Sequence, residues 1–280
     1  MAAATVIGFP SVMKYPILIV FSVLLLWCKP GLAGATSVYL EELTSAELAG
    51  AIRAGTTTII IPVGGTEQNG PHMALGKHNM RARLLSERIA LAVGKTLVAP
   101  VLAYVPEGNI TPPTEHMRFA GTISVPEAAF KAVLDATARS LRQHGFRDVV
   151  LLGDSGNYQA ALRAVVDRLN KDWAGSSARA HFIAEYYTAT QTTYVAALKA
   201  RGITAAQIGT HAGTADTSLL MALDPSMVRP GLFSQAAREG RPGGTGGDPQ
   251  AATAQLGLFG VEAVVQQASA AIRAAVSARR

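Results

Sequence analysis

Short apolar runs alternate along the chain with longer segments in which apolar residues recur every three or four positions. The β-branched, apolar run at residues 56–63 predicts a buried strand. Similar runs predict three further strands, at residues 97–101, 149–152 and 180–184. The amphipathic pattern predicts helices over residues 80–93, 126–144, 157–170, 212–223 and 261–280. Strands that alternate with helices predict an α/β fold with a mostly parallel sheet covered on both faces.

Local signals mark the ends of several of these helices. The run Thr44-Ser45-Ala46-Glu47 has the pattern of a capping box, which predicts a helix from there to about Ala54. Pro126 suits the first turn of a later helix, and Gly145 suits its end. No internal repeat or linker divides the rest of the chain, so we expect one domain after the N-terminal segment.

The N-terminal segment has the composition of a secretory signal peptide. Residues 17–27 form an apolar run, in which Ser22 is the one polar residue, that is short for a membrane span, and Lys14 precedes it. Ala33 and Ala35 supply the small residues that signal peptidase reads, which predicts cleavage after Ala35. We therefore expect a signal peptide at residues 1–35, a domain at residues 36–280, and a periplasmic or secreted protein. An uncleaved anchor is the alternative.

Composition excludes several classes of protein. With 49% hydrophobic and 16% charged residues in 280, the chain has ample apolar sequence for a core and is not disordered. The net charge of +6 is spread along the chain, so we expect neither a nucleic-acid partner nor, after signal cleavage, a membrane partner. The single cysteine, Cys28, supports no disulfide framework and no cysteine-based zinc site.

Side chains capable of catalysis or metal binding gather in the loops. In parallel sheets the ligand site lies beyond the carboxyl ends of the strands, where the loops after Val63 and Leu152 would open. The candidates in these and two further loops are Glu67, Asn69, His72, His78, Glu115, His116, Asp154, Ser155, Asn157, His211 and Asp216. Imidazole and carboxylate groups around an open position suit metal-assisted hydrolysis. The alternative is that these side chains cap helices and tie loops.

Five blocks of the sequence resemble the motifs of the creatininase (creatinine amidohydrolase) family. Residues 61–72, IPVGGTEQNGPH, are similar to the family's P-x-G-x-x-E-Q-H-G-P-H. Four later blocks follow in the family's order: EHMRFAGTIS at 115–124, GDSGN at 153–157, HAGTADTS at 211–218, and GDPQAATAQLG at 247–257. The resemblance implies a layered α/β sandwich, often assembled as a hexamer. It also implies hydrolysis of non-peptide C–N bonds in a small molecule, with a pair of zinc or manganese ions.

The chain departs from the family at most of the metal-ligand positions. Glu67 keeps the family glutamate, but Asn69 stands where the first histidine belongs and His78 where the aspartate belongs. Asp154 stands at the histidine of N-G-H, and Thr214 replaces a glutamate. Since His78 and Asp154 exchange one imidazole and one carboxylate, we expect Glu67, His78 and Asp154 to hold one zinc or manganese ion per chain.

The remaining candidates take the other roles in the expected hydrolase. His116 or His72 would donate a proton, and Asp216 would join the metal or act as a base. Substrate would contact Glu115, Asn157 and His211.

Two alternatives to the metal-dependent hydrolase stay open. The first is an inactive binding or scaffold protein on the same fold. A serine nucleophile at Ser155 is a further alternative, although the sequence lacks the G-x-S-x-G spacing of a nucleophile elbow.

Overall fold

A computed structural model describes residues 1–3, 5 and 37–278 of the chain. The apolar run at residues 17–27 and the expected cleavage point after Ala35 lie outside these residues, so the signal peptide stays a prediction. Within the described ranges, no helix has both the length and the apolar composition needed to cross a bilayer.

Four parallel strands form the central sheet in the order β2-β1-β3-β4. The strands are β1 (Thr58–Val63), β2 (Thr96–Val98), β3 (Asp148–Gly153) and β4 (Arg179–Phe182). The parallel α/β fold expected from the sequence is confirmed, although β2 ends at Val98 rather than at residue 101. In the register of β1 on β3, Val63 lies opposite Gly153, so the two central strands end side by side.

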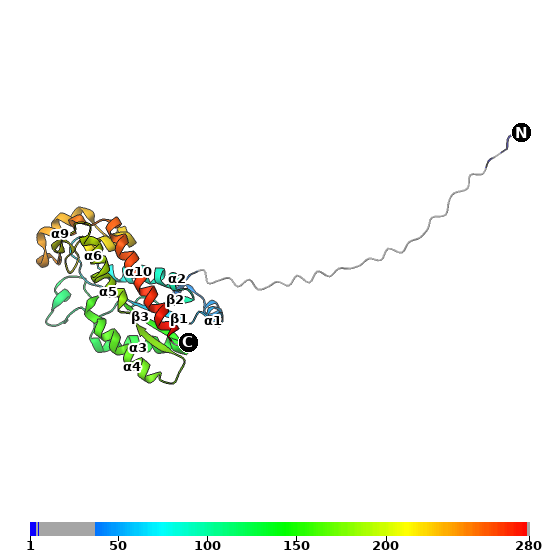
Figure 1. The fold of residues 1–280 in the computed structure, drawn as a ribbon, viewed down its shortest axis with the longest axis horizontal. Helices are drawn as coiled ribbons and strands as arrows, with labels where there is room; N and C mark the ends of the chain where they lie inside the picture. The colour runs from blue at the N-terminus through cyan, green and yellow to red at the C-terminus, as the bar shows by residue number, and fades with distance from the viewer. Residues whose placement is uncertain (4, 6–36, 279–280) are drawn as a thin grey trace. The chain divides into compact units, whose positions relative to one another are not determined.

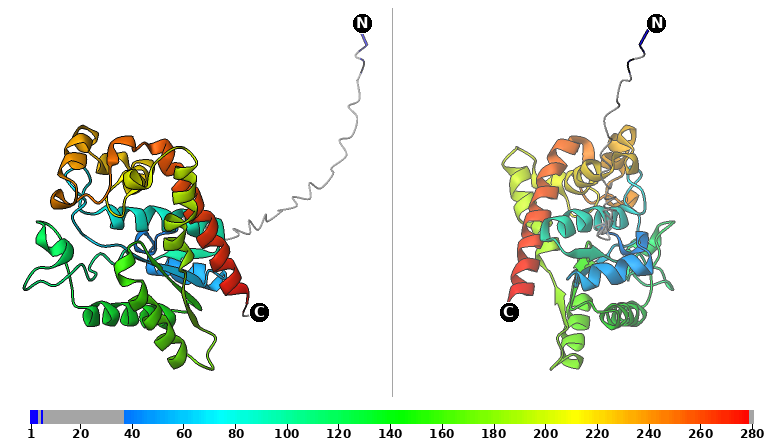
Figure 2. Two further views of the ribbon diagram at one scale, coloured as in Figure 1. Left: turned by 60° about the vertical axis from the view of Figure 1, so that its left-hand side comes forward. Right: turned by 90° about the vertical axis from the view of Figure 1, so that its right-hand side faces the viewer.

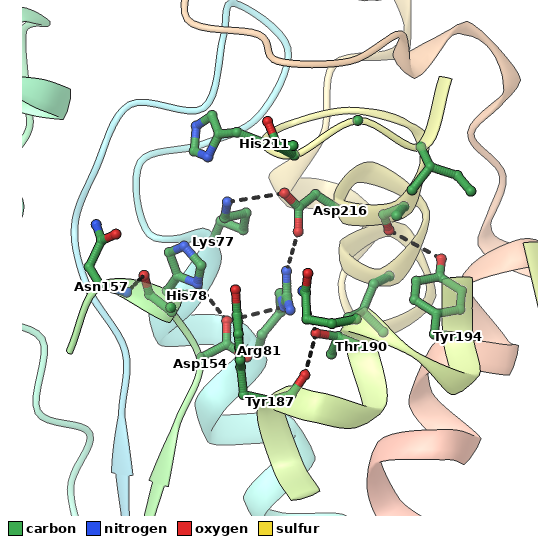
Figure 3. A pocket seen from close by; sticks show the side chains of 18 of the residues that line it. Lys77, His78, Arg81, Asp154, Asn157, Tyr187, Thr190, Tyr194, His211 and Asp216 are labelled. Atoms are coloured by element: carbon green, nitrogen blue, oxygen red, sulfur yellow. Dashed lines mark hydrogen bonds and ion pairs between the residues drawn. The ribbon is translucent and has the colours of Figure 1, made fainter. Parts of the chain in front are cut away.

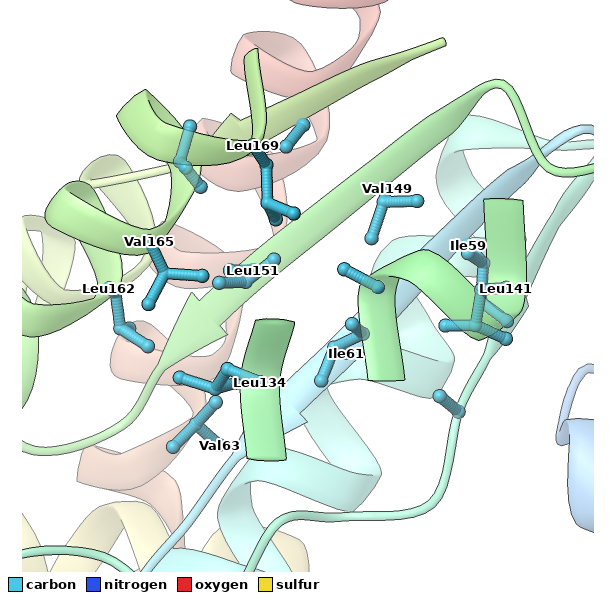
Figure 4. Close-up of a cluster of buried hydrophobic side chains, with 14 of the residues drawn as sticks. Ile59, Ile61, Val63, Leu134, Leu141, Val149, Leu151, Leu162, Val165 and Leu169 are labelled. Atoms are coloured by element: carbon cyan, nitrogen blue, oxygen red, sulfur yellow. The ribbon is translucent and has the colours of Figure 1, made fainter. Parts of the chain in front are cut away.

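Helices cover both faces of the sheet (Figures 1 and 2). One face carries α1 (Ser45–Arg53), α3 (Glu127–Gln143) and α4 (Gln159–Asp172). The other carries α2 (Lys77–Val93), α5 (Glu185–Gln191), α6 (Thr193–Lys199), α8 (Thr214–Leu223) and α10 (Ala254–Ser277). Side chains alternate along β1, so that Ile59 and Ile61 pack against Leu134 and Leu141 of α3 on the first face (Figure 4). Ile60 points into the second core.

The capping box at the first helix is confirmed. Thr44 accepts a hydrogen bond from the backbone of Glu47, and the Glu47 carboxylate accepts one from the backbone of Thr44. The last helix begins earlier than expected, at Ala254, because the Thr253 side chain caps it by accepting a hydrogen bond from Leu256. Helices α5 and α6 have no counterpart among the predicted elements, since their threonines and tyrosines are poor helix formers.

Two further short helices and several 3-10 turns lie in the connections between the main elements. The helices are α7 (Ala205–Ile208) and α9 (Phe233–Glu239). The 3-10 turns are η1 (Leu40–Glu42), η2 (Glu115–Arg118), η3 (Gly156–Tyr158), η4 (Pro225–Met227), η5 (Pro230–Leu232), η6 (Arg241–Gly243) and η7 (Pro249–Ala251). The glycine-rich segment at residues 238–250 therefore contains ordered turns.

A close backbone approach fixes the start of α2 beside the end of β1. A side chain at Gly64 would place its Cβ against Asn79, 2.8 Å from the Asn79 Cα. The Asn79 side chain in turn accepts a hydrogen bond of 2.9 Å from the backbone of Gly65. The first turn of α2 is thus held at the carboxyl edge of the sheet, where the loops after β1 and β3 also lie.

Candidate active site

A pocket of about 190 Å³ opens at the carboxyl ends of β1 and β3 (Figure 3). Glu67 comes from the loop after β1, and Asp154 follows β3 directly. The first two turns of α2 supply Lys77, His78 and Arg81, and α8 supplies Asp216. The sequence elements that we expected to form a site therefore do meet at this edge of the sheet.

Three basic side chains stand on one face of α2. Lys77 and Arg81 are four residues apart and His78 and Arg81 are three apart, so all three project from neighbouring turns. They are almost fully buried, with exposed fractions of 1% for Lys77, 6% for His78 and 3% for Arg81. Cations are unfavourable at a helix N-terminus and in a protein interior, so this face requires acidic partners.

Glu67 and Asp154 meet the two ring nitrogens of His78. Nε2 of His78 lies 2.8 Å from Oε1 of Glu67, and Nδ1 lies 2.6 Å from Oδ2 of Asp154. Burial and Lys77 act to lower the pKa of His78, but the two carboxylates outweigh them and raise it. Since each ring nitrogen faces a carboxylate oxygen, the geometry is that of an imidazolium that donates a hydrogen bond on each side.

Asp216 and Asp154 take the remaining basic groups. Nη1 of Arg81 lies 2.7 Å from Oδ1 of Asp216 and its Nε lies 3.2 Å from Oδ2 of Asp154. Nζ of Lys77 lies 3.3 Å from Glu67 and 3.6 Å from Asp216. Burial acts to raise the pKa of Asp216, but Lys77 and Arg81 hold it well below its usual value. Three cations and three carboxylates thus form a neutral buried network.

This network changes the expected metal site. Glu67, His78 and Asp154 do lie together, but the His78 ring stands between the two carboxylates and both of its nitrogens are occupied by them. A single ion cannot reach both sides of an imidazole ring at ligand distances of about 2 Å. The three residues are better described as a hydrogen-bonded chain than as a ligand set.

A different trio in the described part of the chain has the arrangement of a metal site. Glu67, His116 and His211 each present a ligand atom, and these atoms lie within 4.8 Å of one another. Nε2 of His116 lies 3.3 Å from Oε2 of Glu67, and Nδ1 of His211 lies 3.7 Å from Oε1 of Glu67. One carboxylate and two imidazoles form a donor set used by catalytic zinc enzymes.

Both imidazoles of this trio are neutral, and the hydrogen bond of His211 leaves its Nδ1 free to bind a metal. Burial lowers the pKa of His211 to about 3 and also lowers the pKa of His116, so both rings are neutral near pH 7. Nε2 of His211 lies 3.0 Å from the carbonyl oxygen of Gln68, to which it donates. The lone pair of His211 is therefore on Nδ1, the atom that faces Glu67.

His72 and Asn69 lie away from the pocket in structural roles. His72 is fully buried with Nε2 3.0 Å from the hydroxyl of Thr217, and its ring packs edge-on against Phe233. Asn69 donates hydrogen bonds to the backbone oxygens of Glu67 and Ala74 and so ties the loop after β1. The expected role of His72 as proton donor has no geometric basis.

The other predicted residues divide between two cavities. Asn157 lines the small pocket, whereas Glu115 lines a neighbouring cavity of about 660 Å³. His116 and His211 line both cavities. Ser155 lines the pocket too, but its hydroxyl accepts a hydrogen bond from the backbone of Asn157 and caps η3. No imidazole among the described residues is hydrogen-bonded to Ser155, which removes the basis for a serine nucleophile.

Three residues of the site were not predicted from the sequence. Arg81 lies inside the helix predicted at residues 80–93, and Lys77 lies just before it. The signal that could have found them is their spacing, because Lys77, His78 and Arg81 share one face of a helix. Glu107 is fully buried and accepts a hydrogen bond of 3.0 Å from Asn157. Burial and the charge of Glu67 raise the pKa of Glu107 to about 8, so it holds a proton near neutral pH.

Comparison with known proteins points to one family. Residues 41–272 match the creatininase family, described as creatinine amidohydrolase. The chain is 28% identical over 197 residues to the creatinine amidohydrolase of Pseudomonas putida, covering 69% of this chain and 74% of that protein. A solved structure described as "Creatininase Mn" superposes with a TM-score of 0.70 at 25% identity, covering 85% of this chain and 98% of the other.

A second relative matches more strongly over a shorter stretch. The chain is 38% identical over 117 residues to the mycofactocin precursor peptide peptidase of Mycobacterium tuberculosis strain CDC 1551 / Oshkosh. This match covers 39% of the chain and spans 44% of the length of that relative. The similarity therefore extends across only part of the peptidase.

Proposed function

Because the chain belongs to the creatininase family, we propose that it is an amidohydrolase that cleaves a non-peptide C–N bond in an amide or lactam with the help of one divalent metal ion. The ion would be held by Glu67, His116 and His211. The observation that carries this proposal is the convergence of their ligand atoms at the rim of the buried pocket. This ligand set replaces the one expected from the sequence.

The donor atoms suit zinc or manganese, the two ions that the family resemblance implies. Separations of 3.3 and 3.7 Å between the carboxylate oxygens and the imidazole nitrogens leave room for an ion about 2 Å from each. A divalent ion there supplies a Lewis acid that polarises an amide carbonyl and acidifies water.

The protein's own side chains would bind the substrate, supply a proton and position the charged groups. Asn157 lines the pocket beside Glu107, which supports the proposal that it hydrogen-bonds a substrate amide. Glu107 holds a proton next to Glu67 and is hydrogen-bonded to Asn157 at the pocket, which supports a role as the source of the proton that a departing nitrogen requires. Asp216 is saturated by Lys77, Arg81 and the backbone of Ala212, so it serves to position these groups rather than as a base.

The neutral network argues for one ion rather than two. Glu67, Asp154 and Asp216 are already neutralised by Lys77, His78 and Arg81. A second divalent ion among these carboxylates would have to displace a buried cation of the protein itself. The expectation of one ion per chain is thus kept, with a different set of ligands.

Elemental analysis of protein purified without a histidine tag tests the proposal. We expect about one zinc or manganese per chain in the wild type and in His144→Ala, an exposed histidine at the end of α3. Glu67→Gln, His116→Ala and His211→Ala should each lose the ion and the hydrolysis of a panel of lactams and cyclic ureas. Asp154→Asn should keep the ion, which separates this ligand set from the one that contains Asp154.

The opposite results have definite meanings. No metal in the wild type, even after incubation with zinc and manganese, would overturn the hydrolase and favour a metal-free binding protein. Two ions per chain would contradict the argument from the neutral network. Metal retained in His116→Ala and His211→Ala but lost in Asp154→Asn would restore the ligand set expected from the sequence.

Location and assembly are part of the same proposal. The apolar run at residues 17–27, followed by Ala33 and Ala35, supports export to the periplasm or beyond. Amino-terminal sequencing of protein from the periplasmic fraction should begin at Thr36. A homo-oligomer, supported by the family resemblance, should elute in size-exclusion chromatography with light scattering at a multiple of the chain mass.

A further inference from the structure

The wider cavity next to the pocket contains two arginines without acidic partners. It measures about 660 Å³ and shares His116, Thr210 and His211 with the small pocket. Arg118 and Arg241 both line it. Both arginines are exposed, and within the described ranges neither guanidinium is in an ion pair, whereas Arg83 and Arg139 each bind two carboxylates.

The two arginines come from separate turns whose backbones are fixed. Arg118 ends η2, where Phe119 donates a backbone hydrogen bond to His116. Arg241 begins η6, where Gly244 donates one to Arg241 itself and Thr245 donates one to Gly240. The cavity therefore presents both guanidiniums from ordered turns rather than from free loops.

The turn that bears Arg241 is also anchored to the site. A side chain at Gly244 would place its Cβ against the Gln68 carboxamide, 2.7 Å from Cδ. Nε2 of Gln68 lies 3.0 Å from Nδ1 of His116 and 3.3 Å from Nε2 of His211. The same side chain thus contacts both imidazoles of the proposed metal site and the arginine turn, so the distance between them is set by the fold.

The charge of the cavity selects a class of ligand. Among its described lining residues, Glu115 is the one carboxylate against two guanidiniums. Guanidinium groups bind carboxylates through paired, charge-assisted hydrogen bonds, and unpaired arginines in a cavity favour such a partner. Phe119 and Pro242 add apolar surface for the rest of a ligand.

We propose that Arg118 and Arg241 bind a carboxylate on the substrate, so that the enzyme acts on lactams or amides that carry an acid group. The inference rests on the proposed function for the reacting end of the molecule. The reactive amide would lie by Glu67, His116 and His211, and its acid group would lie in the wider cavity. Arg118 and Arg241 would then be specificity-determining residues.

Binding of matched probe pairs tests the carboxylate site without requiring turnover. The probes are pyroglutamate against pyroglutamamide, and hydantoin-5-acetate against hydantoin-5-acetamide, measured by calorimetry on the metal-loaded full chain. We expect the acids to bind at least about tenfold more tightly than the amides, the effect of one charge-assisted contact. Arg118→Ala and Arg241→Ala should each weaken acid binding about tenfold and leave amide binding and metal content unchanged.

A matched control and the contrary outcomes complete the design. Arg238→Ala removes an exposed arginine from α9, which does not line the cavity, and should change neither probe. Equal affinity for acid and amide would overturn the proposal, and so would no binding of either acid at millimolar concentration. An unchanged preference in a variant that carries both Arg118→Ala and Arg241→Ala would also overturn it. Preference for acids without hydrolysis of any would contradict the proposed function alone, because the binding measurement is independent of catalysis.

Discussion

Asp154 is the residue on which the buried network depends most directly. Its two oxygens face His78, Arg81 and the hydroxyl of Tyr186, which donates a hydrogen bond of 2.8 Å. It is also 2% exposed, so water cannot replace any of these contacts. From the sequence we expected Asp154 to bind a metal ion, whereas in the structure it pairs with His78 and Arg81.

Removing this charge should destabilise the fold. Asp154→Asn leaves Arg81 and His78 without one of their buried partners, and we expect a loss of about 3–5 kcal/mol in the free energy of unfolding. Asp172→Asn is the control, because Asp172 pairs with Arg139 on the surface and should contribute less than about 1 kcal/mol. Urea unfolding of the three proteins makes the comparison. Equal losses in both variants would show that the buried network does not stabilise the fold.

His72 should make stability depend on pH. Burial lowers its pKa from 6.5 to about 4, so the unfolded chain binds a proton between these values that the folded protein does not. The contribution is complete above about pH 6.5 and is lost as the pH falls toward 4, with a slope of at most about 1.4 kcal/mol per pH unit.

The variant His72→Gln isolates this contribution. Glutamine can hydrogen-bond Thr217 but does not titrate, so its stability should fall less steeply over the same pH window. Urea unfolding across that window gives both slopes. Parallel curves for the two proteins would mean that His72 is not kept neutral by its burial.

At the scale of elements, close packing of α8 on α10 positions Asp216. A Cβ at Gly257 of α10 would contact the backbone oxygen of Ser218 in α8 and lie 2.8 Å from the Cβ of Ala222. The absence of a side chain at this position lets the two helices approach. Asp216 then reaches Lys77 and Arg81 on α2 from the opposite side of the pocket.

Gly257→Ala should therefore disturb both packing and the site. We expect a loss of about 1–3 kcal/mol in stability from overpacking, together with weaker substrate binding as α8 shifts. Gly231→Ala is the control, because a Cβ there meets no atom within 4 Å. Denaturant unfolding and probe calorimetry follow the two effects. Wild-type values for Gly257→Ala would show that the helices can separate freely.

The elements with the strongest local signals were those that the sequence predicted well. The apolar run at β1 and the capping box at Thr44 agree with the structure, because each is decided by residues adjacent in sequence. Helices α5 and α6 were missed since packing of Tyr186 and Tyr194 into the core overrides their composition. The pairing of Glu67 with His116 and His211 joins three distant segments, and no local pattern encodes which of several histidines will meet it.

For the whole molecule, the proposed ion should add stability without being needed for folding. Binding of zinc at a free concentration about 100-fold above its dissociation constant should stabilise the protein by about 2.7 kcal/mol. His211→Ala should show no such gain. Urea unfolding with and without zinc, followed by circular dichroism, measures the difference. An unfolded spectrum for the chelated wild type would contradict the expectation.

The self-neutralised network has a consequence for a cell whose metal supply varies. Because Lys77, His78 and Arg81 already balance the carboxylates, removal of the ion leaves no cluster of like charges to force the loops apart. We expect chain made during metal starvation to accumulate in a folded, protease-resistant form. Activity would then return within the time an ion takes to diffuse in, with no new synthesis.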